Sequence, residues 1–152
     1  MSTQPREYEL DELYRDLILD HYRQPRNHAP LAHPTCASEG ENPLCGDQVA
    51  VQIELADGTL ADIGFSGRGC SISQASTSMM TECVKGKPLA EVRELIDQFK
   101  AMMLQDAEPT PQLGDLESLQ GVRKFPVRVK CATLAWNVLE RLLQANAQGG
   151  TA

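Results

Sequence analysis

Two stretches of alternating side chains joined by an Asp-Gly pair constrain the fold of this chain more than any other feature. The alternating apolar positions are Val49, Val51, Ile53 and Leu55, followed by Leu60, Ile63 and Phe65. Period-two alternation is typical of half-buried strands, and Asp57-Gly58 is a preferred hairpin turn. The pattern therefore predicts an antiparallel β-hairpin at about 49–65, and we expect a short strand near 37–41.

Apolar residues elsewhere recur at three- and four-residue spacing, which is typical of helices that bury one face. This spacing predicts helices at about 7–23, 71–85, 89–103 and 126–144, and a short helical stretch at 116–121. Strands early in the chain and helices afterwards predict an α+β fold, a small antiparallel β-sheet with helices packed on one face. Since no repeat or linker interrupts the chain, we expect a single domain over 1–152, with a frayed tail at 145–152.

Charge and cysteine content restrict where such a chain works. Its 152 residues carry 14 Lys+Arg and 21 Asp+Glu, for a net charge of −7, with 5 Cys. An acidic surface repels phosphate backbones, so nucleic acid is not an expected partner. The polar start of the chain and the odd cysteine count argue against export, and no apolar run is long enough for a membrane span. We therefore expect a cytoplasmic protein with reduced thiols.

Three cysteines occupy positions from which they could share one ion. Cys45 lies in the Pro/Gly loop NPLCGD, Cys70 follows SGRG at the start of the predicted helix 71–85, and Cys131 is expected in the opening turn of the last helix. Free N–H groups at a helix start stabilise a thiolate. With the carboxylate of Asp47, three sulfurs would fill the four positions that zinc prefers.

Each cysteine also has a simpler interpretation. Cys131 continues an apolar helical stripe and can be a core residue, and a Gly-rich turn before Cys70 is ordinary architecture. Cys83 extends an apolar helix face, which indicates core packing, and Cys36 in its proline-rich loop is expected at the surface. The polar neighbours of His21 and His28 indicate solvated side chains.

Four short blocks resemble the U-type iron–sulfur cluster assembly proteins, the family that includes IscU and the N-terminal part of NifU. The blocks are DHYRQPRN (20–27), NPLCGD (42–47), GRGCSIS (67–73) and VKCATLAW (129–136). They occur in the family's order, and the resemblance covers about residues 8–144. It implies the U-type α+β fold and a surface metal site with the ligands Cys45, Asp47, Cys70 and Cys131.

Two features resemble the SufU branch of this family rather than the IscU-like scaffolds. Lys130 precedes the last motif cysteine where the scaffolds have His, and the chain carries an insertion around 104–121. The resemblance implies a zinc-dependent sulfurtransferase. Such a protein takes persulfide sulfur from a pyridoxal-phosphate-dependent cysteine desulfurase of the SufS type and passes it to a downstream iron–sulfur assembly scaffold.

The residues suggest roles within that reaction. Cys45 is expected to be the sulfur acceptor, because its loop can move at lower cost than the two helix positions. Arg128, or its neighbour Lys130, is expected to offset the excess negative charge of a zinc ion held by three thiolates and a carboxylate. Two alternatives remain: a scaffold that assembles and transfers a [2Fe–2S] cluster or binds iron, and a non-catalytic protein whose zinc stabilises the fold.

Overall fold

The computed structural model describes residues 7–149, and the side chains of residues 11–146. Its β-sheet contains β1 (Cys36–Asn42), β2 (Asp47–Ala56), β3 (Thr59–Arg68) and the two-residue β4 (Lys87–Pro88). These strands lie in the order β1-β2-β3-β4, and each pair is antiparallel. The predicted hairpin is confirmed: Asp57 and Gly58 join β2 to β3 with φ of 53° and 74°, backbone angles that Asp and Gly tolerate.

The helices follow the predicted periodicity, with two differences. They are α1 (Glu7–Arg23), α2 (Ser71–Val84), α3 (Leu89–Leu104), the 3-10 helix η1 (Pro111–Lys124) and α4 (Pro126–Gly149). The predicted stretch 116–121 lies inside the longer η1, which is interrupted at Gly114. Residues 145–149 of the tail that is expected to fray belong to α4, and 150–152 lie outside the described residues.

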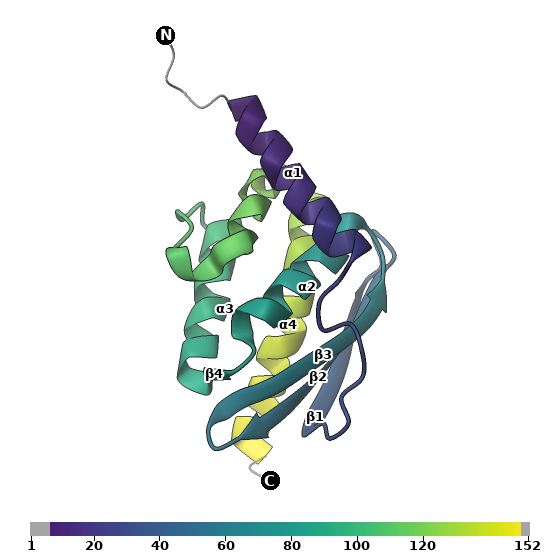
Figure 1. Cartoon of the computed structure of the whole chain (residues 1–152), viewed down its shortest axis with the longest axis vertical. Coiled ribbons are helices and arrows are strands. Elements are labelled where there is room, and N and C mark those ends of the chain that lie inside the picture. Colours follow the sequence, from purple (N-terminus) through teal and green to yellow (C-terminus); the bar gives the residue numbers. More distant parts are fainter. Residues whose placement is uncertain (1–6, 150–152) are drawn as a thin grey trace.

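Helices cover one face of the sheet, as the α+β pattern predicts (Figure 1). Val49, Val51 and Ile53 of β2 point into the core that α2 and α4 complete, and each is at most 1% exposed. In this core the ring of Trp136 on α4 stacks on Phe99 of α3, with ring centroids 4.4 Å apart. This packing holds α4 in place along the sheet.

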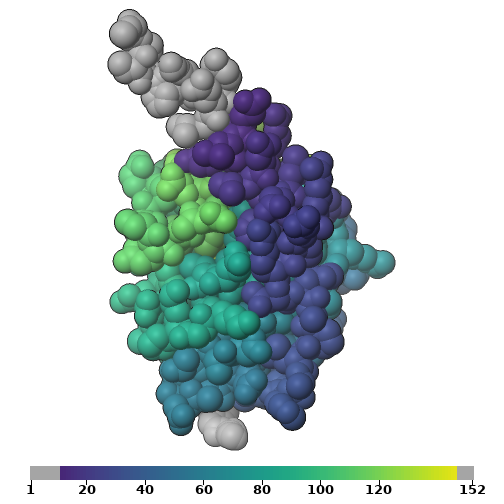
Figure 2. Space-filling model, viewed as in Figure 1, coloured from purple at the N-terminus to yellow at the C-terminus, as the bar shows by residue number. Residues whose placement is uncertain are grey.

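The chain between α1 and β1 runs along the molecular surface (Figure 2). It contacts β3, where the N–H of Phe65 donates to the carbonyl of Asn27 at 3.0 Å. Gly64 allows this approach, because a Cβ there would lie 2.2 Å from the carbonyl oxygen of Ala29. Among the described residues, no helix is both long and apolar enough for a membrane crossing.

Candidate metal centre

Cys45 lies in the turn that joins β1 to β2. Asn42 and Asp47 form the last residue pair between these strands, so residues 43–46 close the hairpin. The N–H of Cys45 donates to the carbonyl of Asn42 at 3.1 Å, and Gly46 has a φ of +69°. The turn leaves Cys45 partly exposed at the end of the sheet.

Asp47 and Cys70 meet because β2 begins where β3 ends. Cys70 is the N-cap residue of α2, as predicted, and its N–H donates to Oδ1 of Asp47 at 2.9 Å. The Cys70 Sγ lies 3.9 Å from Oδ2 of the same carboxylate. Gly69 makes room for Asp47, since a Cβ at this position would lie 2.3 Å from Oδ1.

Cys131 comes to the same place from α4. The expectation that it occupies the opening turn is wrong: α4 begins at Pro126, so Cys131 lies in the second turn, where its sulfur contacts the carbonyl of Val127 at 3.5 Å. Its side chain is 1% exposed, and its Sγ lies 3.0 Å from that of Cys45. The simpler interpretation of Cys131 as a buried residue is thus also correct, and burial and contact with Cys45 occur together.

All four predicted ligands therefore gather at one end of the sheet. One ligand atom each from Cys45, Asp47 and Cys131 lies within 4.8 Å of the others, and Cys70 is joined to this group through Asp47. Three sulfurs and one carboxylate oxygen form a donor set that fits zinc, which takes four ligands at about 2.0–2.3 Å. The same donors could hold iron.

The pKa of Cys131 differs from that of a thiolate at a helix start, which is lowered. Burial raises the pKa of Cys131, and hydrogen bonds with Asp47 and Cys45 raise it further. Without a cation its sulfur therefore keeps its proton, and a metal must displace that proton to bind. On the solvent side, the negative charge of Cys70 raises the pKa of Arg128, followed by the contributions of Cys131 and Cys45. The positive charge of the Arg128 guanidinium thus opposes the negative charge of these cysteines.

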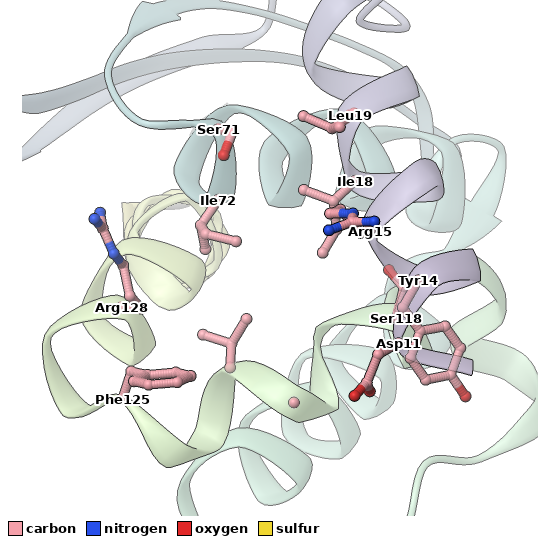
Figure 3. Close-up of a pocket in the computed structure, with 12 residues that line it drawn as sticks. Asp11, Tyr14, Arg15, Ile18, Leu19, Ser71, Ile72, Ser118, Phe125 and Arg128 are labelled. Atoms are coloured by element: carbon pink, nitrogen blue, oxygen red, sulfur yellow. The ribbon is translucent and has the colours of Figure 1, made fainter. Parts of the chain in front are cut away.

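A groove of about 520 Å³ begins beside this centre and runs between α1, the start of α2 and η1. Figure 3 shows Arg128, Phe125 and Ile72 of α2 on one side of the groove, and Tyr14 and Arg15 of α1 on the opposite side. Most of its lining is apolar. Three large apolar side chains near the centre are exposed, namely Leu44, Phe125 and Val127.

Residues 13–143 match the family model described as the NifU-like N terminal domain. The chain belongs to this NifU-like N-terminal domain family. The match contains all four candidate ligands. Relatives in this family are named either as a zinc-dependent sulfurtransferase or as iron–sulfur cluster assembly scaffold proteins.

The chain is 44% identical over 142 residues to the zinc-dependent sulfurtransferase SufU of Bacillus subtilis, covering 93% of this chain and 95% of that protein. It is 42% identical to the iron–sulfur cluster assembly scaffold protein IscU of Streptococcus pyogenes, covering 91% and 89%. A crystal structure described as a putative iron–sulfur cluster assembly scaffold protein for the SUF system, from Fervidobacterium islandicum, superposes with a TM-score of 0.79 at 32% identity, covering 90% and 98%. These likenesses confirm the predicted family and fold.

Two residues of this NifU-like domain have places that the sequence analysis did not assign. Asn42, the first residue of the NPLCGD block, is 7% exposed and its Nδ2 lies 3.6 Å from Cys131 Sγ, so its amide can donate to the sulfur. His21 was expected in solvent and is fully buried. Its spacing from Leu17 and Ile18 on one helix face was the signal, since residues three and four apart lie on the same side of a helix.

Proposed function

We propose that this chain takes part in iron–sulfur cluster biogenesis as a zinc-dependent sulfur acceptor for a cysteine desulfurase. The observation that carries the proposal is the meeting of a partly exposed turn cysteine with Asp47, Cys70 and Cys131 at the end of the sheet. The reaction needs reduced thiols, which fits the cytoplasm.

Cys45, Asp47, Cys70 and Cys131 would hold the zinc. When bound, zinc keeps the coordinating thiols deprotonated and has no redox chemistry of its own. Asp47 is fixed by the Cys70 N–H, and Cys131 is buried within α4, so these ligands are held by the fold. Cys45 is the ligand whose backbone belongs to a turn, and it is therefore the one best able to leave the ion.

The transfer step is a thiol exchange at a persulfide. The Cys45 thiolate attacks the outer sulfur of the desulfurase persulfide, a new S–S bond forms on Cys45, and the desulfurase cysteine leaves as a thiolate. The two sulfurs that exchange partners keep the same total oxidation state, so no reductant or oxidant is consumed. Arg128, near all three cysteines, would stabilise the charge of the released thiolate. The sulfur would then pass to a downstream assembly scaffold.

The surface around the centre would receive the desulfurase. Leu44 adjoins Cys45, and Phe125 and Val127 lie at the start of α4, where exposed apolar side chains are typical of a protein contact. A persulfide carried on a loop of the partner could reach Cys45 without crossing the core. The partner would thereby also exclude water from the exchanging sulfurs.

A scaffold role is the second candidate, and the likeness to the Streptococcus pyogenes scaffold favours it. In that case the four ligands would hold a [2Fe–2S] cluster as cargo. Protein purified without air would then show iron, acid-labile sulfide and visible absorption, whereas a zinc-loaded sulfur acceptor would be colourless.

The deciding experiment combines the zinc-loaded chain with a cysteine desulfurase and free cysteine. We expect faster alanine production than with desulfurase alone, and one extra sulfur on the Cys45 peptide by mass spectrometry under non-reducing conditions. Cys45→Ala should abolish both effects. Cys83→Ala is the matched control and should preserve them, since Cys83 packs against the core away from the centre. Stimulation that survives Cys45→Ala would contradict the assignment.

A further inference from the structure

A second cluster of metal-binding side chains lies where α1, α2 and η1 meet. His21 of α1 is fully buried, and its Nε2 lies 3.2 Å from Oδ2 of Asp115 on η1 and 3.9 Å from Oε1 of Glu82 on α2. The side chains of Asp115 and Glu82 are 50% and 49% exposed. The imidazole therefore approaches, from inside, two carboxylates that solvent reaches from outside.

The other ring nitrogen of His21 fixes this orientation. Nδ1 lies 2.8 Å from the hydroxyl of Ser78, and the same hydroxyl accepts the N–H of Arg26 at 2.9 Å. Histidine ligands of metals commonly have their second nitrogen held by a hydrogen bond, which leaves the first free for the ion. Nε2 faces the two carboxylates and donates its N–H to Oδ2 of Asp115 at 3.2 Å, so an ion bound here would take the place of that proton.

The order Ser78, His21 and Asp115 also resembles a nucleophilic triad, but burial excludes that chemistry. Ser78 is 0% exposed and lies inside α2, so no substrate can reach its hydroxyl. The accessible part of the cluster is the carboxylate side. The arrangement is therefore suited to a ligand that approaches the carboxylates.

The charge at the cluster calls for a cation. Among the side chains of residues 11–146, neither Glu82 nor Asp115 forms a salt bridge with Lys or Arg, and each has the imidazole of His21 within 4.0 Å. The nearby basic residues are paired elsewhere: Arg26 with Asp20 at 2.7 Å, and Lys85 with Asp62 at 3.3 Å. Two carboxylates thus approach one imidazole, which supplies no charge when neutral.

We infer that His21, Glu82 and Asp115 form a second metal site, which binds a first-row divalent cation. An ion about 2.0–2.2 Å from each donor separates neighbouring donors by roughly 3–3.6 Å, close to the observed 3.2 and 3.9 Å. One imidazole and two carboxylates suit Mn²⁺, Co²⁺ or Zn²⁺, and water can complete the coordination because both carboxylates are half exposed.

Such an ion would connect three elements that are distant in the sequence. Asp115 follows Gly114, whose φ of 56° and ψ of −127° break η1 immediately before the ligand. The ion would hold this part of η1 against α1 and α2. It is independent of the cysteine centre, since none of its donors is a sulfur and none of the four predicted cysteine-site ligands belongs to it.

The test uses the full chain with the cysteine centre first filled by one equivalent of zinc. Mn²⁺ is then added, because it binds oxygen and nitrogen donors in preference to thiolates, and the loss of its aqueous EPR signal reports binding. We expect saturable binding of one Mn²⁺ per chain, with broadening of the His21 ring resonances in NMR spectra. Asp115→Asn and Glu82→Gln should each weaken binding at least tenfold.

The variants are chosen so that folding does not decide the result. Asp115 and Glu82 are half exposed, so their isosteric amides should leave the circular dichroism spectrum unchanged. Asp57→Asn in the β2–β3 turn is the matched control and should bind Mn²⁺ as the natural chain does, since Asn tolerates its φ of 53°. Absence of saturable binding, equal binding by all variants, or binding without broadening at His21 would each overturn the inference.

Discussion

The sulfur of Cys131 lies 3.0 Å from the sulfur of Cys45, although 86 residues separate them in the sequence. One sulfur belongs to a turn at the end of the sheet and the other to the second turn of a long helix. Their contact depends on the packing of α4 along β1 and β2, which the core enforces. The proposed metal ligands are thus positioned by the same contacts that hold the fold together.

Gly69→Ala tests how closely the backbone must approach Asp47. The new Cβ would lie 2.3 Å from Oδ1 and 2.8 Å from Cα of Asp47, so the carboxylate or the strand must move. We expect zinc affinity to fall and the free energy of unfolding to drop by about 1–3 kcal/mol, a typical cost of overpacking. Urea unfolding and a competitive zinc titration measure the two effects.

Gly121→Ala is the control for this substitution. A Cβ at Gly121 meets no atom within 4 Å, and its φ is not positive. This variant should retain zinc affinity and should not lose stability, because replacing glycine restricts the unfolded chain. If both variants lost zinc to the same extent, the close approach at Asp47 would not be the cause.

Zinc removal should destabilise the chain without unfolding it. A ligand present at a thousand times its dissociation constant stabilises the native state by about 4 kcal/mol. The core, which includes Trp136 and Phe99, does not depend on the metal. Adding a chelator should therefore lower the melting temperature while the far-ultraviolet circular dichroism at 25 °C persists. The same chelator should have little effect on Cys70→Ala, which lacks a ligand that the fold holds in place, and an equal shift in that variant would place the stabilising zinc elsewhere.

The sequence predicted the elements well because hydrophobic spacing reports local structure directly. It placed the hairpin, the helix starts at Ser71 and Pro126, and the cysteine at the start of α2. It could not bring Cys45 and Cys131 together, because spacing along a chain does not encode contacts between elements. The positions and chemistry of the cysteines allowed a shared ion as one interpretation beside core packing, and the family resemblance favoured the shared ion.

The wrong predictions for His21 and Cys131, and the unassigned place of Asn42, have the same physical origin: spacing along the chain does not encode contacts between elements. His21 has polar sequence neighbours, but its helix face decides its burial, and that face packs against Ser78. The sequence predicts Cys131 in the opening turn of the last helix, but it lies in the second turn, and the raised pKa of this buried thiol is opposite to the effect expected at a helix start. Asn42 has no local pattern that identifies it as a partner of a distant sulfur.

Cys83 should react slowly with alkylating reagents. Burial raises its pKa from 9.0 to about 11, so the reactive thiolate is about a hundredfold scarcer at pH 8 than in an unfolded chain. Iodoacetamide labelling followed by peptide mass spectrometry should show this deficit in the folded protein and its loss in denaturant. Equal labelling rates in the two states would contradict the expected burial effect.

The raised pKa of Cys83 also makes the free energy of unfolding depend on pH. The unfolded state releases the Cys83 proton as pH rises through about 9, while the folded state holds it until about 11. The contribution of Cys83 is therefore complete below pH 9 and is lost as pH rises toward 11. Urea unfolding of the natural chain and of Cys83→Ala at pH 8 and pH 10 isolates this contribution, and the natural chain should lose more stability between these values.

Arg128→Ala should slow sulfur transfer more than it affects folding. The side chain is exposed, so its removal leaves no cavity, but the negative charge of Cys70, followed by the contributions of Cys131 and Cys45, raises the pKa of its guanidinium. Without it, the thiolate released from zinc loses a compensating positive charge. We expect a roughly tenfold slower transfer, the lower end of the range of about 10–10³ by which surface charge raises association rates, with an unchanged melting temperature. Single-turnover transfer from a persulfidated desulfurase measures the rate, and added salt should slow the natural chain more than the variant.

Lys130→Ala is the control for this prediction, because it removes the same charge two residues away. This variant should transfer sulfur at close to the natural rate. Equal slowing by both variants would assign the effect to net charge rather than to the position of Arg128.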